Sequence, residues 1–215
     1  MKKYWKAAVL VSCGLLLTGC TLWTGSGRKE RMLEYMNTRY DDRFEYIGSY
    51  SVSEILVASE KYPDKKIWVM EYSRNSSGYT DNYLDYVYEE ASFEAIRGML
   101  EEAFGVPVVL TCRIPERGMP CSLPADVSLD GYLEGREDPF IFFAVVSPDY
   151  TPEESDTERR IMERFGRMNI TAVINFAETR EVFDGILSGE LQQVTDGKQL
   201  DIMIMDGRIT DCHWS

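Results

Sequence analysis

Histidine is nearly absent from this chain, because His213 is the only one among 215 residues. Any catalytic set that combines histidine with serine or cysteine would have to use it, and no partner motif accompanies it. Its neighbour Cys212 should point to the opposite face of a strand. A catalytic role therefore stays an alternative only in one form. In that form the protein is a surface hydrolase that uses His213 or one of Cys112, Cys121 and Cys212 in an unrecognised arrangement.

Basic residues are also scarce, with 23 Lys and Arg against 36 Asp and Glu and a formal net charge of −13. Residues 1–19 contain three Lys and no acid, so their removal would leave a net charge of −16. Nucleic-acid binding needs clustered Lys and Arg to meet the phosphates, and this composition therefore excludes it. Anionic lipid headgroups should likewise repel the folded part of the chain.

No apolar run is long enough to cross a membrane. The longest uncharged and mostly apolar stretch, residues 7–17, has 11 residues, whereas a helical span needs about 20 apolar residues. Lys2, Lys3 and Lys6 precede this stretch and Gly19 follows it. A basic start, a short apolar core and small residues before a break are typical of a secretory signal.

Leu17-Thr18-Gly19-Cys20 resembles the lipobox of bacterial lipoproteins. The resemblance implies a diacylglyceryl group on the Cys20 thiol, cleavage before Cys20, acylation of the new amino terminus with palmitate-type chains, and a place on the outer face of the bacterial cell membrane. We therefore expect a signal peptide at 1–19 and a lipid-anchored tether at 20–28. The alternative is an ordinary signal peptide that happens to contain a cysteine. Two or more acyl chains hold a protein stably at a membrane.

Cysteine is too sparse for a disulfide framework. Only Cys112, Cys121 and Cys212 follow Cys20. Cys112 and Cys121 flank a Pro- and Gly-containing segment and form a possible disulfide, while three buried thiols remain the alternative. No close-spaced zinc ligands and no nucleotide-binding glycine motif occur, so we expect neither a metal nor a cofactor.

The pattern of apolar residues predicts an α+β fold with mostly antiparallel sheet covered by helices. Two small subdomains are expected at 29–114 and 140–215. The Pro- and Gly-rich segment 115–139 is either the junction between them, which we favour, or a functional loop. The predicted helices are 29–40, 82–104, one opening near Thr151, and 179–188. The predicted strands are 44–47, 54–60, 67–72, 106–112, 140–146, 170–176 and a hairpin turning at Asp206-Gly207.

Two local expectations concern polar residues. Asn82 is a candidate cap for helix 82–104, which Gly105 should end. Asp81, Asp85 and Glu89 recur at four-residue steps, a spacing that favours a solvated helix face over a calcium site.

Tyrosine is the most suggestive signal, with eight residues between Tyr46 and Tyr88. Aromatic rings beside acids can stack on sugars or peptides, but tyrosine is also favoured in half-buried strands. The two alternatives are thus ordinary sheet packing and a binding surface. The residues that would form such a surface are Tyr72, Tyr79, Tyr83 and Tyr86.

The stretches RMLEYMNTRYDDRFEYIG and YTDNYLDYVYEEASFEAIRGMLEEAFG resemble uncharacterised exported lipoproteins of Firmicutes. That resemblance implies a habitat and no mechanism. The hypothesis we favour is a non-enzymatic, membrane-anchored extracytoplasmic module that binds an envelope protein or a wall glycan. A structural accessory without a ligand of its own is a further alternative.

Overall fold

The computed structural model describes residues 25–72, 78–113, 122–190 and 197–215. They fold into two compact units that divide after Tyr83. Helices and mostly antiparallel sheets make up both units, which confirms the predicted α+β class. Among the described residues, no helix is both long and apolar enough to cross a bilayer. The predicted lipidation site, Cys20, lies outside these residues, as does the predicted signal peptide.

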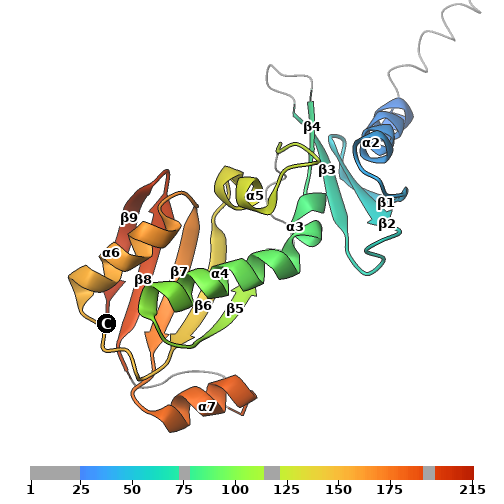
Figure 1. Cartoon of the computed structure of the whole chain (residues 1–215). Coiled ribbons are helices and arrows are strands. Elements are labelled where there is room, and N and C mark those ends of the chain that lie inside the picture. Colours follow the sequence, from blue (N-terminus) through green and yellow to red (C-terminus); the bar gives the residue numbers. More distant parts are fainter. Residues whose placement is uncertain (1–24, 73–77, 114–121, 191–196) are drawn as a thin grey trace, which may run out of the picture. The chain divides into compact units, whose positions relative to one another are not determined.

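The described residues of the first unit form one helix and four strands, labelled in Figure 1. In chain order they are α2 (Gly25–Arg39), β1 (Phe44–Ser51), β2 (Glu54–Ser59), β3 (Ile67–Tyr72) and β4 (Gly78–Asp81). The helix therefore begins inside the segment 20–28, which was predicted to be a tether.

The strands of the first unit form an antiparallel meander in the order β1-β2-β3-β4. Helix α2 packs against β1, β2 and β3 through Met32 and Met36, which are fully buried. Alternation along the strands directs one set of side chains toward this helix. That set includes Phe44, Ile55, Val57, Ile67 and Val69, all buried.

The second unit contains the remaining elements. They are α3 (Tyr83–Val87), which begins at the division, α4 (Glu89–Phe104), β5 (Val108–Arg113), α5 (Leu129–Gly135), β6 (Phe140–Val146), α6 (Glu154–Phe165), β7 (Ile170–Phe176), α7 (Arg180–Ser188), β8 (Gln199–Met205) and β9 (Arg208–Trp214).

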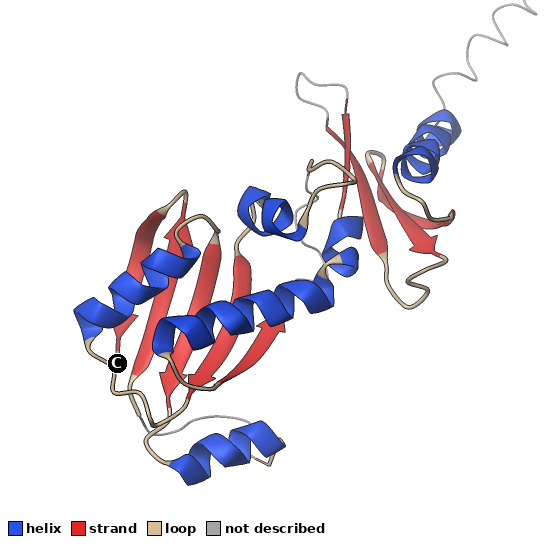
Figure 2. Ribbon diagram, in the orientation of Figure 1, coloured by secondary structure: helices blue, strands red, loops and turns tan. Residues whose placement is uncertain are grey.

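The second sheet has the strand order β5-β6-β7-β8-β9. Only β6 and β7 are parallel, and α6 provides the crossover between them. Figure 2 shows α4 and α6 lying across one face of these five strands. On that face Phe140, Phe142, Ala144 and Val146 of β6 are at most 3% exposed, so the core of this unit lies between the sheet and the two helices.

Most predicted strands match the structure closely. The hairpin turns at Asp206 and Gly207, whose φ angles of 50° and 74° are those of the predicted type I′ turn.

Thr179 caps α7 by accepting a hydrogen bond from the Val182 N–H. The helix predicted to open near Thr151 instead begins at Glu154 without a side-chain cap.

The predicted helix 82–104 is two helices. The helical conformation is interrupted at Tyr88, between α3 and α4. The Asn82 side chain accepts a hydrogen bond from the Trp68 N–H at 2.7 Å, which links the residue before α3 to β3. The short strand β4, which the sequence did not predict, ends at Asp81, directly before Asn82, and pairs with β3.

The division between the units differs from the predicted junction at 115–139. Strand β5 pairs with β6 along its whole length, so it belongs to the second sheet rather than to the first unit. Residues 114–121 lie outside the described part of the chain, and 122–139 include α5.

Two glycines of α4 allow a matched test of this helix. Gly105 has φ 71°, and a β carbon there would meet no atom within 4 Å; Gly98 lies in the helix interior with equally open surroundings. We expect Gly105→Ala to lower the free energy of unfolding by about 1 kcal/mol through backbone strain. Gly98→Ala should raise it by about 0.5–1 kcal/mol. Urea unfolding measures both, and changes of the same sign would contradict the assignment.

Candidate functional site

The tyrosine-rich region of the first unit surrounds a buried carboxylate. The hydroxyls of Tyr35 and Tyr40 each donate a hydrogen bond to Asp81 at 2.9 Å, and the Tyr83 N–H donates a third at 2.9 Å. Arg39 Nε lies 3.6 Å from the same carboxylate. A buried charge is tolerated only when it is paired and hydrogen-bonded, so these groups explain how Asp81 is accommodated.

A second carboxylate, Asp42, joins three segments of the same unit. Its Oδ2 accepts hydrogen bonds from the hydroxyls of Ser59 and Tyr83, the latter at 2.8 Å. Its Oδ1 accepts from the backbone N–H groups of Arg43 at 2.7 Å and Lys61 at 3.3 Å. This network ties the loop after α2 to the end of β2 and to the start of α3.

The two carboxylates have opposite pKa shifts. Burial raises the pKa of Asp81, and the hydrogen bonds and the Arg39 charge only partly offset that effect. Burial also acts to raise the pKa of Asp42, but the hydrogen bonds from Ser59, Tyr83 and the backbone outweigh it and lower the pKa. Each shift follows from the packing of this network, which is a sufficient structural reason for the perturbed groups.

The four tyrosines predicted as a binding surface have different surroundings. Tyr83 is only 4% exposed, and its ring lies 4.5 Å from that of Tyr40. Tyr79 is half-buried, with its ring 5.3 Å from Tyr35, and Tyr86 is also half-buried. The side chain of Tyr72 lies outside the described part of the structure. Packing therefore accounts for Tyr83, and exposed aromatic surface must be sought elsewhere in this unit.

Exposed apolar side chains gather at the β1–β2 hairpin. Ile47, Tyr50 and Val52 are 51%, 62% and 78% exposed. The ring of Tyr50 stacks edge-on at 5.2 Å against Trp68 of β3. Alternation places Leu56 and Trp68, which are register partners, on the sheet face opposite α2. We call Ile47, Tyr50, Val52, Leu56 and Trp68 the hairpin surface.

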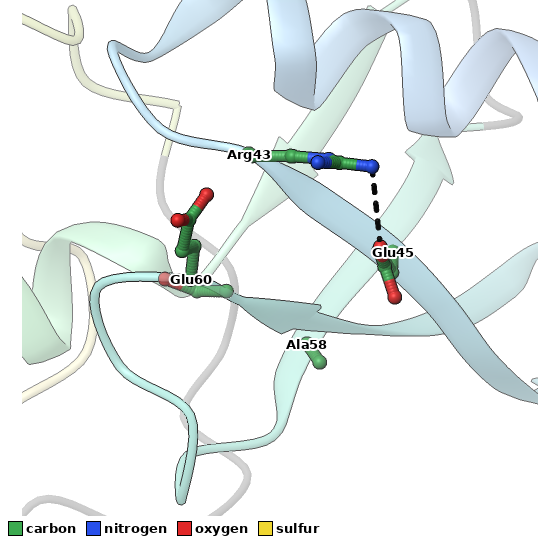
Figure 3. Close-up of a pocket in the computed structure, with 5 residues that line it drawn as sticks. Arg43, Glu45, Ala58 and Glu60 are labelled. Carbon is green, nitrogen blue, oxygen red and sulfur yellow. Dashed lines mark ion pairs between the residues drawn. The ribbon is translucent and has the colours of Figure 1, made fainter.

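A pocket of about 250 Å³ lies on the same sheet (Figure 3). Arg43, Glu45, Ala58, Ser59 and Glu60 line it. Arg43 forms an exposed ion pair with Glu45 at 3.6 Å, drawn as a dashed line in Figure 3. Glu45 and Ala58 are register partners, and alternation places Ala58 on the same face as Leu56. A polar pocket thus adjoins the hairpin surface.

The sequence did not single out Tyr50 or Trp68. One signal was available, because IGSYSVSE places Tyr50 and Val52 among small polar residues where a hairpin turns. Apolar residues at a turn are rarely needed for the core. Their exposure is therefore more informative than the number of tyrosines in the region.

The carboxylates Asp81, Asp85 and Glu89 do not share a solvated helix face, and that prediction is wrong. Asp81 belongs to β4, and in the second unit Asp85 is buried against α5. It accepts hydrogen bonds from Tyr132 Oη at 2.7 Å and from Arg136 Nη1. Burial raises the pKa of Asp85 despite the neighbouring Arg136 charge. Among the described residues, no three His, Cys, Asp or Glu side chains are grouped so that they could hold a metal ion.

Cys212 and His213 lie on opposite faces of β9, as alternation predicted. Cys212 faces α6, where its Sγ lies 3.4 Å from Glu158 Oε1, and Trp214 Nε1–H donates to the same oxygen at 2.9 Å. Burial, reinforced by the Glu158 carboxylate, raises the pKa of the Cys212 thiol to about 11. His213 is exposed on the other face. Cys121 and the side chain of Cys112 lie outside the described part, so their bridge stays a prediction.

This environment predicts a slowly reacting thiol. At neutral pH we expect iodoacetamide to alkylate Cys212 about tenfold or more slowly than free cysteine, because so little thiolate is present. Glu158→Gln should speed the reaction, while Glu163→Gln on the same helix serves as the matched control. Peptide mapping by mass spectrometry follows residue 212 alone. Rapid labelling of this thiol would contradict the assignment and would favour the hydrolase hypothesis.

Comparisons with known proteins add little to this geometry. The chain matches no family model and no curated protein. A similar solved structure is that of a DUF5037 family protein from Ruminococcus gnavus ATCC 29149, an uncharacterised protein of a Firmicutes bacterium. The similarity covers 84% of this chain and 93% of that chain, with 10% sequence identity and a TM-score of 0.42. No functional conclusion follows from a likeness at this level.

Proposed function

We propose that this protein is a lipid-anchored, extracytoplasmic module that binds an envelope protein or a wall glycan and does not catalyse a reaction. The lipobox-like Leu17–Cys20 segment supports the anchor, and the exposed hairpin surface supports the binding role. The hydrolase alternative gains no support from Cys212, because burial raises the pKa of its thiol and its side chain lies on the face of β9 opposite His213.

The observation that carries the proposal is the exposed Tyr50 ring against Trp68, beside a polar pocket. Aromatic rings supply large contact area at low cost in side-chain entropy, and they stack on sugars as well as on peptide side chains. The neighbouring Arg43, Glu45 and Glu60 offer charged hydrogen-bond donors and acceptors at the pocket. Exposed apolar side chains next to polar groups are a common composition of a recognition surface.

The anchor makes its own prediction. Protein from its native host should partition into the detergent phase and carry an acylated Cys20, since lipid chains bring the chain into the micelle. Cys20→Ser should move it to the aqueous phase. Mass spectrometry of the N-terminal peptide identifies the modification. A wild-type protein that stays in the aqueous phase with a free thiol would refute the anchor.

The binding surface is tested with the detergent-solubilised full-length protein. Tyr50→Ala should reduce by about tenfold the amount of partner retained from solubilised envelopes, or of protein that sediments with insoluble wall glycan, because a central aromatic anchor contributes about 1–3 kcal/mol to binding. The side chain is 62% exposed, so its removal should lower the free energy of unfolding by only about 0.5–1.5 kcal/mol through loss of the contact with Trp68, and the unit should stay folded.

The matched control is Leu187→Ala, which removes a similarly exposed apolar side chain (66%) from the second unit. It should leave retention unchanged. Retention from solubilised envelopes reports a protein partner, and sedimentation with insoluble wall glycan reports a glycan partner. If wild type and Tyr50→Ala retain the same material in the same amounts, the hairpin surface is not the binding site.

A further inference from the structure

Strand β6 of the second unit carries apolar residues on both of its faces. β6 reads FIFFAVV and has no polar side chain on either face. Its residues Phe140, Phe142, Ala144 and Val146 fill the face that α4 and α6 cover. An antiparallel sheet with one face in water normally alternates apolar and polar residues. The sequence of β6 is instead that of a strand buried on both faces.

The second face of this sheet is open around Phe143, whose side chain is 49% exposed. In the strand register, Phe143 lies between Thr111 of β5 and Val173 of β7. Its neighbours on this face are part-exposed and mostly apolar. The apolar residues of this face are Ile141, Val145, Val173 and Met203, which with Phe143 we call the open face. Thr111 and Thr171 lie on the same face, and Met203 follows Thr171 on the next strand. Helix α7 also contacts β6, yet Phe143 remains exposed.

Acidic side chains border the open face on the β8–β9 side. Asp201 is the register partner of Val173, and Asp211 is the register partner of Met203. Arg208 lies farther along the hairpin, paired with Met205. Asp201 therefore adjoins Val173, and Asp211 adjoins Met203 at the β8–β9 edge of the open face, while Arg208 lies at the turn. At the other edge, Arg113 of β5 is the register partner of Ile141.

The charge of the whole second unit has the same sign. Residues 84–215 hold 26 of the 36 acidic residues but only 11 of the 23 basic ones, a net charge of −15. Seven arginines of this unit are engaged in ion pairs within it. These pairs leave a surplus of carboxylates on the second unit. The open face is therefore poorly suited to bind either a second copy of itself or an anionic lipid surface, because like charges repel.

We propose that the open face docks a partner protein through an aliphatic surface bordered by Lys or Arg. The apolar centre supplies burial for the aliphatic part, and Asp201 and Asp211 supply the complementary charge. This surface belongs to the second unit and does not depend on the hairpin surface of the first.

The test uses the full-length protein in a nonionic detergent and a fluorescein-labelled 12-residue peptide of alternating Leu and Lys. Fluorescence anisotropy at about 150 mM salt measures binding after subtraction of the signal from detergent alone. The wild type should bind the peptide saturably. Phe143→Ser should weaken binding about tenfold or more. The double variant Asp201→Asn/Asp211→Asn should weaken it similarly without changing the apolar centre.

Two controls define the result. Glu90→Gln/Glu154→Gln removes two charges from exposed positions on α4 and α6 and should change affinity by less than about twofold. Tyr50→Ala should have no effect, so failure here is distinguishable from failure of the proposed function. Three results would overturn the proposal. They are an equal loss of peptide affinity in the Asp201/Asp211 and Glu90/Glu154 double variants, equal affinity for a peptide of alternating Leu and Glu, and an unchanged affinity in Phe143→Ser. Sedimentation showing a wild-type dimer that Phe143→Ser dissociates would also overturn it, because the occupant would then be a second copy.

Discussion

In the described part of the chain, α2 covers one face of the first sheet, and α4 and α6 cover one face of the second, and both candidate surfaces lie on the opposite faces. In the first unit α2 covers the face that carries Val57 and Val69, while Trp68 and Leu56 point the other way. In the second unit α4 and α6 cover Phe142 and leave Phe143 exposed. A single helical layer buries one set of alternating side chains, so the character of the other set decides what the second face does.

Several residues that look chemically active have structural roles instead. Asp81, Asp42 and Asp85 are held by tyrosine hydroxyls, backbone N–H groups and arginine. Their shifted pKa values follow from burial and hydrogen bonding within these networks. The same holds for Cys212 beside Glu158. Buried polar groups require such partners, so a perturbed carboxylate is by itself weak support for catalysis.

Charge distinguishes the two units more sharply than fold does. Residues 1–83 hold 12 basic and 10 acidic residues, whereas residues 84–215 hold 11 basic and 26 acidic residues, so the net negative charge of the chain belongs to the second unit. In a lipid-anchored protein, an acidic unit would be repelled by anionic headgroups and would attract cationic partners. The proposed functions of the hairpin surface and of the open face are therefore compatible, since each uses a different unit and a different kind of contact.

Local patterns determined a large part of the architecture. The strands β3, β6 and β7 have the predicted bounds, because continuous or alternating apolar residues are a short-range signal, and Asp206-Gly207 specifies its turn by backbone conformation alone. The two-residue period of a strand was likewise enough to place Cys212 and His213 on opposite faces. Only the tertiary structure decided that β5 joins the second sheet, that Asp81 is buried, and which face of β6 is covered. Those outcomes depend on which distant strands pair and where the helices pack, and no short stretch of sequence contains that information.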